Sequence, residues 1–132
     1  MKFVAAHYDG ACLTVTAPLA ENINHKDTAF AGSLNALATL TGWGLIWLVL
    51  KEAHEEAKVI IQESTIQYLV PVAGDFSAQC HKPQEDQLAR FLHILRERGK
   101  ARITLTVRIE HAGQTAVLFS GRFIAHRAGI FR

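Results

Sequence analysis

The sequence predicts an α+β fold in which an antiparallel β-sheet wraps around one long central helix. Residues 28–50 carry no formal charge, while several flanking segments alternate between apolar and polar residues. Hydrophobic residues make up 49% of the 132 residues and charged residues 20%, which is a globular composition. This length suits one domain, expected to span residues 1–132.

Two short strands are expected at the start of the chain. The first covers Phe3–Tyr8 and the second Ala11–Ala17, where Leu13 and Val15 alternate with threonines. Asp9-Gly10 between them is a typical hairpin turn.

The uncharged segment follows an irregular, Asn-rich stretch and is expected to continue as a helix to about Ala53. A helix of this length could cross a bilayer, which needs roughly 20 apolar residues. A helix surrounded by protein has the same composition, however, and Ser33, Asn35 and Thr39 would make a poor lipid-facing surface. The interpretation is a core helix, with no membrane association.

Two features inside this helix call for a packing explanation. Trp43 and Trp47, four residues apart, are expected to fill the core. Gly42 and Gly44 each cost about 1 kcal/mol relative to Ala in a helix, so we expect a strand backbone to approach closely there.

The second half of the chain has the pattern of a continued antiparallel sheet with one short helix. Alternation is strictest around Ile103, Leu105 and Val107, and Gly99 is expected to end the helix. The expected strands are Lys58–Leu69, Phe76–His81, Arg102–Glu110 and Thr115–His126, and the expected helix is Pro83–Arg98.

Charge and cysteine usage exclude several function classes. Residues 1–89 hold five Lys/Arg and ten Asp/Glu, and residues 90–132 hold nine and two, so the halves carry −5 and +7. The basic half is explained by solvated strand faces or by a patch for an anionic ligand, and it lacks the motifs of nucleic-acid binding. The histidines have no zinc spacing, and Cys12 and Cys80 are isolated, which favours a reduced, cytoplasmic protein without a metal.

Asn24–Leu34 has the pattern of an Asn loop that enters a central helix, and Ile66–Asp75 has the pattern of a strand followed by Pro, Gly and Asp. Both stretches resemble segments of the hot-dog fold of acyl-thioester enzymes. The order of Pro18–Asn24 and Leu40–Gly44 is closest to a bacterial thioesterase-like domain that is sometimes fused behind an acetyltransferase.

The resemblance implies a thioesterase that acts on acyl-CoA or acyl carrier protein in fatty acid metabolism. It also implies a homodimer, or a tetramer, with sites at the dimer interface. No cofactor is expected, because the pantetheine arm belongs to the substrate. Two alternatives stay open: a decarboxylase of malonyl thioesters on the same fold, and a non-catalytic module that binds acyl thioesters.

The expected catalytic site lies at the start of the central helix. Backbone N–H groups of Ala31, Gly32 and Ser33 would stabilise an oxyanion, and Gly32 would let the substrate come close. The resemblance assigns catalysis also to Asn24, which otherwise would only shape its loop. Phe30 would contact the acyl chain.

The sequence departs from commoner thioesterases at two positions. Phe30-Ala31-Gly32 stands where His-Gly-Gly would be, and Thr39 stands where many members carry a catalytic Asp or Glu. A base for hydrolysis must then come from elsewhere. Glu63 is the first candidate base and would act across a dimer interface, although it could equally be an ordinary exposed carboxylate on a strand. His25 is the second candidate base.

Further residues are expected to contact the substrate. Thr28 and Tyr68 lie within the two similar stretches, and Ser64 and Thr39 offer hydroxyls that could position a water. Lys100 and Arg102 would meet the phosphates of coenzyme A or an acidic carrier protein, or would simply be solvated.

Overall fold

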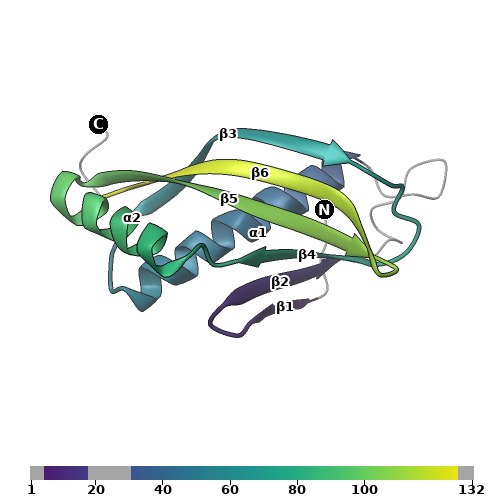
Figure 1. Ribbon diagram of the computed structural model, residues 1–132, viewed down its shortest axis with the longest axis horizontal. Coiled ribbons are helices and arrows are strands. Elements are labelled where there is room, and N and C mark those ends of the chain that lie inside the picture. Colours follow the sequence, from purple (N-terminus) through teal and green to yellow (C-terminus); the bar gives the residue numbers. More distant parts are fainter. Residues whose placement is uncertain (1–4, 18–30, 128–132) are drawn as a thin grey trace.

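The computed structural model describes residues 5–17 and 31–127 (Figure 1). Six strands and two helices follow one another along the chain. They are β1 (Ala5–Tyr8), β2 (Cys12–Ala17), α1 (Ala31–Glu52), β3 (Lys58–Tyr68), β4 (Phe76–His81), α2 (Glu85–Arg98), β5 (Lys100–His111) and β6 (Gln114–His126).

All six strands form one antiparallel sheet in the order β1-β2-β4-β5-β6-β3. The sheet bends around α1, which lies against its concave side (Figure 1). This confirms the predicted α+β arrangement. Within the described chain, β3 pairs only with β6, so its other edge is unpaired.

The predicted elements are confirmed. At most of the described ends, the observed boundary differs from the predicted one by one or two residues. β4 has the predicted bounds, and α1 ends one residue before Ala53. β5 is longer than predicted at both ends, from Lys100 to His111, because its backbone pairing with β6 continues beyond the alternating side chains.

The core forms between α1 and the concave face of the sheet. One stripe of α1 is buried, including Leu34, Leu37, Leu45 and Ile46. On β5 every second side chain, from Ala101 to Ile109, is buried as well, and this alternation produces one apolar face.

The structure corrects the expectation for the two tryptophans. Trp43 is 38% exposed and Trp47 42% exposed, so neither fills the core of a single chain. Both lie on an exposed stripe of α1, four residues apart, and Lys51 lies 5.2 Å from the Trp47 ring centroid.

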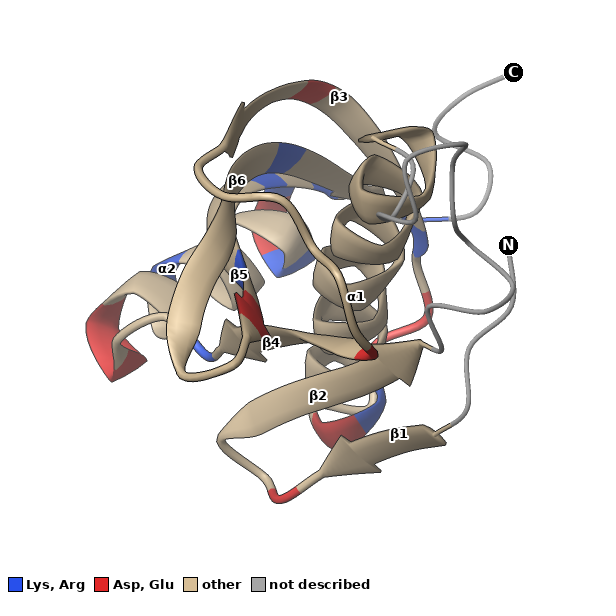
Figure 2. Cartoon of the chain, turned by 90° about the vertical axis from the view of Figure 1, so that its right-hand side faces the viewer, with Lys and Arg blue, Asp and Glu red and all other residues tan. Residues whose placement is uncertain are grey.

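Helix α1 is long and apolar enough to cross a membrane by length and hydropathy, and half of its most apolar window is buried inside the protein. Figure 2 shows that charged residues lie on the outer elements and near the end of α1, while most of the helix has none. The helix is therefore the core helix of the sheet, as predicted.

The two helical glycines allow close packing, but against side chains rather than a strand backbone. A Cβ at Gly42 would lie 2.8 Å from Cζ of Phe123, and one at Gly44 would lie 3.0 Å from Cδ2 of Leu13. The prediction of close packing at these glycines is therefore confirmed, but the groups that approach them are side chains and not the predicted strand backbone.

Helix α2 fills the space beside β5 where β4 no longer pairs with it. The register of β4 with β5 covers only Ser77–Gln79, and Phe91 and Leu95 of α2 are buried in the main core. Gly99 ends the helix as predicted, with φ of 77° and its N–H bonded to the Leu95 carbonyl at 2.7 Å.

Candidate functional site

An open, mostly apolar groove of about 680 Å³ lies between the exposed stripe of α1 and the first residues of β3. None of the described side chains that line it can titrate near neutral pH. The lining residues are Gly32, Asn35, Ala36, Thr39, Leu40, Trp43, Val59, Ile60, Ile61 and Phe123. The groove can therefore hold an apolar chain beside a few polar groups.

The first residues of α1 open into this groove. Ala31 and Gly32 are exposed and Ser33 is half-buried. The first N–H groups of a helix have no partner within the helix, and the helix dipole makes this end favourable for negative charge. An oxyanion at Gly32 would be stabilised by these N–H groups and by the helix dipole.

Tyr68 holds the end of β3 against the same helix terminus. Its hydroxyl donates a hydrogen bond of 3.1 Å to the carbonyl oxygen of Ala31. The structure thus brings Tyr68 to Ala31, the residue that precedes Gly32 and Ser33 at the start of α1.

Polar groups farther along the groove are held by hydrogen bonds. The Thr39 hydroxyl lies 3.5 Å from Oδ1 of Asn35, one helical turn earlier. The Trp43 indole N–H donates to the carbonyl oxygen of Val59 at 2.9 Å, which fixes the middle of α1 to β3. Thr39 thus faces the groove, as a residue that contacts the substrate must.

Glu63 and Ser64 lie on the neighbouring part of β3, outside the groove that Gly32 lines. The register of β3 with β6 shifts between Ile61 and Glu63, which places Glu63 opposite Arg122. Their side chains form an ion pair at 3.3 Å, and the Glu63 side chain is 64% exposed. Both predicted residues line a separate depression of about 210 Å³.

Lys100 and Arg102 lie at the start of β5, beside α2. They line a depression together with Ile94 and Arg98. The structure does not bring them to the α1–β3 groove within one chain.

The remaining predicted residues, Asn24, Thr28 and Phe30, lie outside the described residues, as does His25. Their roles stay predictions.

Sequence reasoning missed Asn35 and Trp43 as groove residues. The signal was present, because Gly32, Asn35, Thr39 and Trp43 recur every three or four residues and so share one face of a helix. An all-apolar helix does not reveal which of its faces the sheet leaves open.

Reactive groups for other chemistries are scarce in the part of the chain that the structure describes. No cluster of three or more His, Cys, Asp or Glu residues there is arranged to hold a metal ion. Burial raises the pKa of the Cys80 thiol to about 12, so this cysteine stays protonated and unreactive.

Comparisons with known proteins concern the family and the fold of this chain. A family model described as "Putative thioesterase (yiiD_Cterm)" matches residues 1–127. A crystal structure of a protein of unknown function from Chlorobaculum tepidum TLS is 36% identical, with a TM-score of 0.86, over 91% of this chain and 79% of that one.

Two further structures carry thioesterase in their names. A "putative thioesterase" from Shewanella oneidensis is 31% identical, with a TM-score of 0.79, over 92% of this chain and 82% of that one. A thioesterase from Haemophilus influenzae is similar in fold alone, with 14% identity and a TM-score of 0.71, over 99% and 82%. The hot-dog fold expected from the sequence is thereby confirmed.

Proposed function

This chain belongs to the family described as "Putative thioesterase (yiiD_Cterm)", and on that premise we propose that it hydrolyses an acyl thioester at the start of α1. The observation that carries the proposal is the exposed start of this helix at Ala31 and Gly32, which opens directly into an apolar groove. The acyl chain lies along the groove, and the thioester carbonyl lies at the helix terminus.

The helix terminus stabilises the charge that develops during the reaction. Attack of water on the thioester carbon produces a tetrahedral oxyanion, and in this proposal the backbone N–H groups of Gly32 and Ser33 donate to it. Among the described residues, and leaving aside the adjoining backbone of α1, no heavy atom lies within 4 Å of the position that a Cβ would take at Gly32, so a carbonyl can approach this backbone. The proposal also gives Asn24, which lies outside the described residues, the role of a side-chain amide donor to this oxyanion.

The proposed base is Glu63, acting on the groove of a second copy. Within its own chain Glu63 is exposed and paired with Arg122, and the described lining of the groove contains no carboxylate. A base from the partner would supply the proton acceptor that hydrolysis requires.

This arrangement requires a homodimer, which we propose forms by pairing along β3. The strand is 11 residues long and leaves one edge unpaired among the described elements. Ile60 is 48% exposed and Ile61 37% exposed, close to the exposed Trp43. Exposed apolar side chains on an unpaired edge strand are an aggregation hazard unless another strand covers them.

The substrate in this proposal is a thioester of coenzyme A or of acyl carrier protein, handled in the cytoplasm. An apolar groove fits the acyl chain, and Lys100 and Arg102 offer positive charge at the start of β5 for phosphates or for an acidic carrier.

Decarboxylation of a malonyl thioester is the second candidate, because the described lining of the groove contains no residue that could act as a base. This reaction breaks the bond between the carboxylate and the α-carbon and releases carbon dioxide. The electron pair forms an enolate, and a proton from water then completes the acetyl thioester. A helix terminus can stabilise the enolate, and no base is needed in the groove.

Product analysis by mass separates these functions. The purified protein is incubated with acetyl-, long-chain acyl- and malonyl-thioesters of coenzyme A and of carrier protein. Free thiol indicates hydrolysis, and malonyl converted to acetyl with the thioester intact indicates decarboxylation. Saturable binding without turnover would leave only the binding module.

A further inference from the structure

The side chains that line the α1–β3 groove grow in size from one end of the groove to the other. On α1 the lining begins with the small residues Gly32 and Ala36, continues with Leu40 and ends with the large indole ring of Trp43. These positions recur every three or four residues, so they share one face of the helix. The groove is therefore bordered by small side chains where the thioester carbonyl is proposed to bind, and by a large ring at its other end.

Two hydrogen bonds between α1 and β3 mark the ends of this groove. At the start of the helix, the Tyr68 hydroxyl donates to the carbonyl oxygen of Ala31 at 3.1 Å. Farther along, the Trp43 indole N–H donates to the carbonyl oxygen of Val59 at 2.9 Å, which holds the ring between helix and strand. Helical side chains lean towards the N-terminal end of their helix, so the exposed 38% of Trp43 can contact a chain in the groove.

The distance between these ends limits the length of a bound acyl chain. Gly32 and Trp43 are eleven positions apart on α1, which corresponds to a rise of about 16 Å. Contact with the ring takes up about 4 Å of this distance. An extended chain of single bonds advances about 1.2 Å per bond, because three backbone bonds span about 3.5 Å. The remaining length of about 12 Å therefore accommodates about ten carbons.

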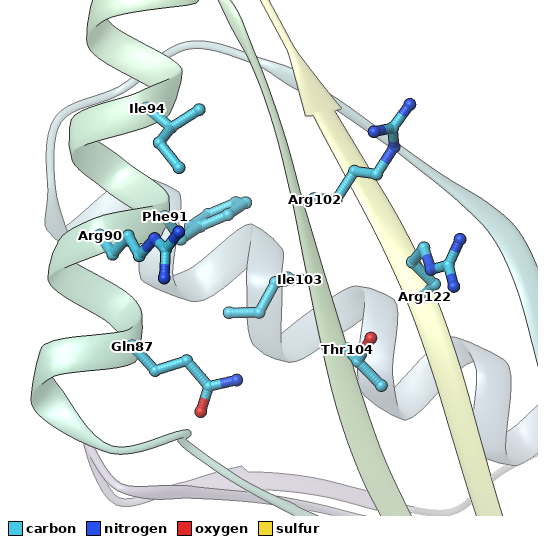
Figure 3. A pocket seen from close by; sticks show the side chains of 8 residues that line it. All are labelled: Gln87, Arg90, Phe91, Ile94, Arg102, Ile103, Thr104 and Arg122. Carbon is cyan, nitrogen blue, oxygen red and sulfur yellow. The ribbon is translucent and has the colours of Figure 1, made fainter.

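A second groove, of about 370 Å³, does not suit an apolar chain. It lies between α2 and the strands β5 and β6, and its lining includes Arg90, Arg102 and Arg122 (Figure 3). Covering charged groups with a hydrocarbon chain removes them from water at a cost in free energy. The described lining of the α1–β3 groove carries no charged side chain, so it is the better site for the acyl chain.

We propose that Trp43 forms the end of the acyl site and limits the bound chain to about ten carbons. The inference rests on the proposed function, since it takes the thioester carbonyl to lie at Gly32. Trp43 contacts the far end of the chain and takes no part in bond cleavage. It therefore determines specificity and is not a catalytic residue.

Binding of a chain-length series tests the proposal without turnover. Ketone analogues of acyl thioesters have a methylene group between the sulfur and the carbonyl, so they cannot be hydrolysed at that bond. Analogues with chains of about four to sixteen carbons, which bracket the expected limit, are carried by coenzyme A and by acyl carrier protein and titrated by calorimetry. For the native protein, Kd should fall about two- to fourfold per added methylene up to about ten carbons, and change less than about twofold beyond.

Two substitutions of Trp43 locate the limit. In Trp43→Ala the fall in Kd should continue, so that a chain of about fourteen carbons binds at least about tenfold more tightly than it binds to the native protein. Trp43→Leu keeps an apolar side chain with high helix propensity, and it should shift the limit in the same direction by a smaller amount. Circular dichroism checks that each variant is folded.

Trp47→Ala is the matched control. Trp47 is the same residue type one helical turn later, is 42% exposed and is not among the described residues that line the groove. Its removal should leave the limit at about ten carbons.

Several results would overturn the inference. The native protein could show no gain in affinity up to about ten carbons, or a gain that continues beyond about twelve. Both Trp43 variants could keep the native limit, or Trp47→Ala could move the limit as far as Trp43→Ala does.

Failure of the inference can be distinguished from failure of the proposed function. A limit that moves with Trp43 in a protein that releases no thiol would refute hydrolysis alone. Thiol release with an unmoved limit would refute only the role of Trp43, and no binding of any analogue would contradict both.

Discussion

The hydroxyl of Tyr68 donates a 3.1 Å hydrogen bond to the carbonyl oxygen of Ala31 and so joins the last residue of β3 to the first residue of α1. The two residues are 37 positions apart in the chain. This contact fixes the helix terminus at which the thioester carbonyl is proposed to bind.

Tyr68→Phe removes this hydrogen bond and keeps the ring. Because Tyr68 is 47% exposed, the free energy of unfolding should fall by only about 0.5 kcal/mol, the low end for a hydrogen bond. The value of kcat/KM should fall about tenfold, since the helix terminus is less firmly placed. Urea unfolding and steady-state kinetics measure the two effects, and unchanged kinetics would remove Tyr68 from the account.

Gly42→Ala should lower stability, whereas Gly32→Ala should lower activity. A Cβ at position 42 would lie 2.8 Å from the fully buried Phe123 ring, so this variant should lose about 1–3 kcal/mol of unfolding free energy. Position 32 has open space, so Gly32→Ala should keep its stability but hinder approach of the thioester and lower kcat/KM.

Chemical denaturation and kinetics on both variants provide the comparison. An unaltered kcat/KM in Gly32→Ala would argue against close approach of the substrate to that backbone.

Ile61→Glu should convert the proposed dimer to a monomer. The substitution places a charge on the unpaired edge strand, once in each copy, where an apolar side chain is now 37% exposed. Sedimentation analysis should give about twice 14.6 kDa for the native protein and 14.6 kDa for the variant. Thr106→Glu, on β5 away from this edge, is the control; a native monomer would contradict the dimer.

Glu55 should make stability depend on pH. A hydrogen bond from Nε of Arg96 at 2.6 Å lowers the pKa of Glu55, and the charge of Arg127 lowers it further. A carboxyl whose pKa is lowered by folding stabilises the protein above its unfolded value, here 4.5, and loses this contribution as the pH falls through the folded value.

Glu55→Gln should therefore lower Tm at about pH 7 and have little effect at about pH 3. Thermal melts at both values measure the difference. Glu56→Gln, at the exposed neighbouring carboxylate, serves as the control, and a Tm loss of equal size at both pH values would contradict the assignment.

The elements of the fold could be predicted because their signals are local. Alternation in β5 and the glycine after α2 each depend on a few neighbouring residues. The exposure of the tryptophans was not predicted. The spacing of Asn35, Thr39 and Trp43 places them on one face of α1, but spacing alone does not indicate which face the sheet leaves open at β3.

The candidate site could be predicted only in part, because its assembly depends on long-range register. The start of α1 was identified from Ala31–Ser33, whereas the ion pair of Glu63 with Arg122 arises from a register shift at Ile61. The groove between α2 and the strands β5 and β6 likewise depends on long-range packing, because no sequence spacing relates Arg90 to Arg122.

Release of free thiol from an acyl thioester is the most direct test of thioester cleavage at the start of α1. The native protein is compared with Asn24→Ala, with the oligomeric state of both checked by sedimentation. We expect saturable thiol release by the native protein, and its loss in Asn24→Ala with the assembly unchanged. Thiol release that is undiminished in Asn24→Ala, or none from any acyl thioester by the native protein, would contradict the account.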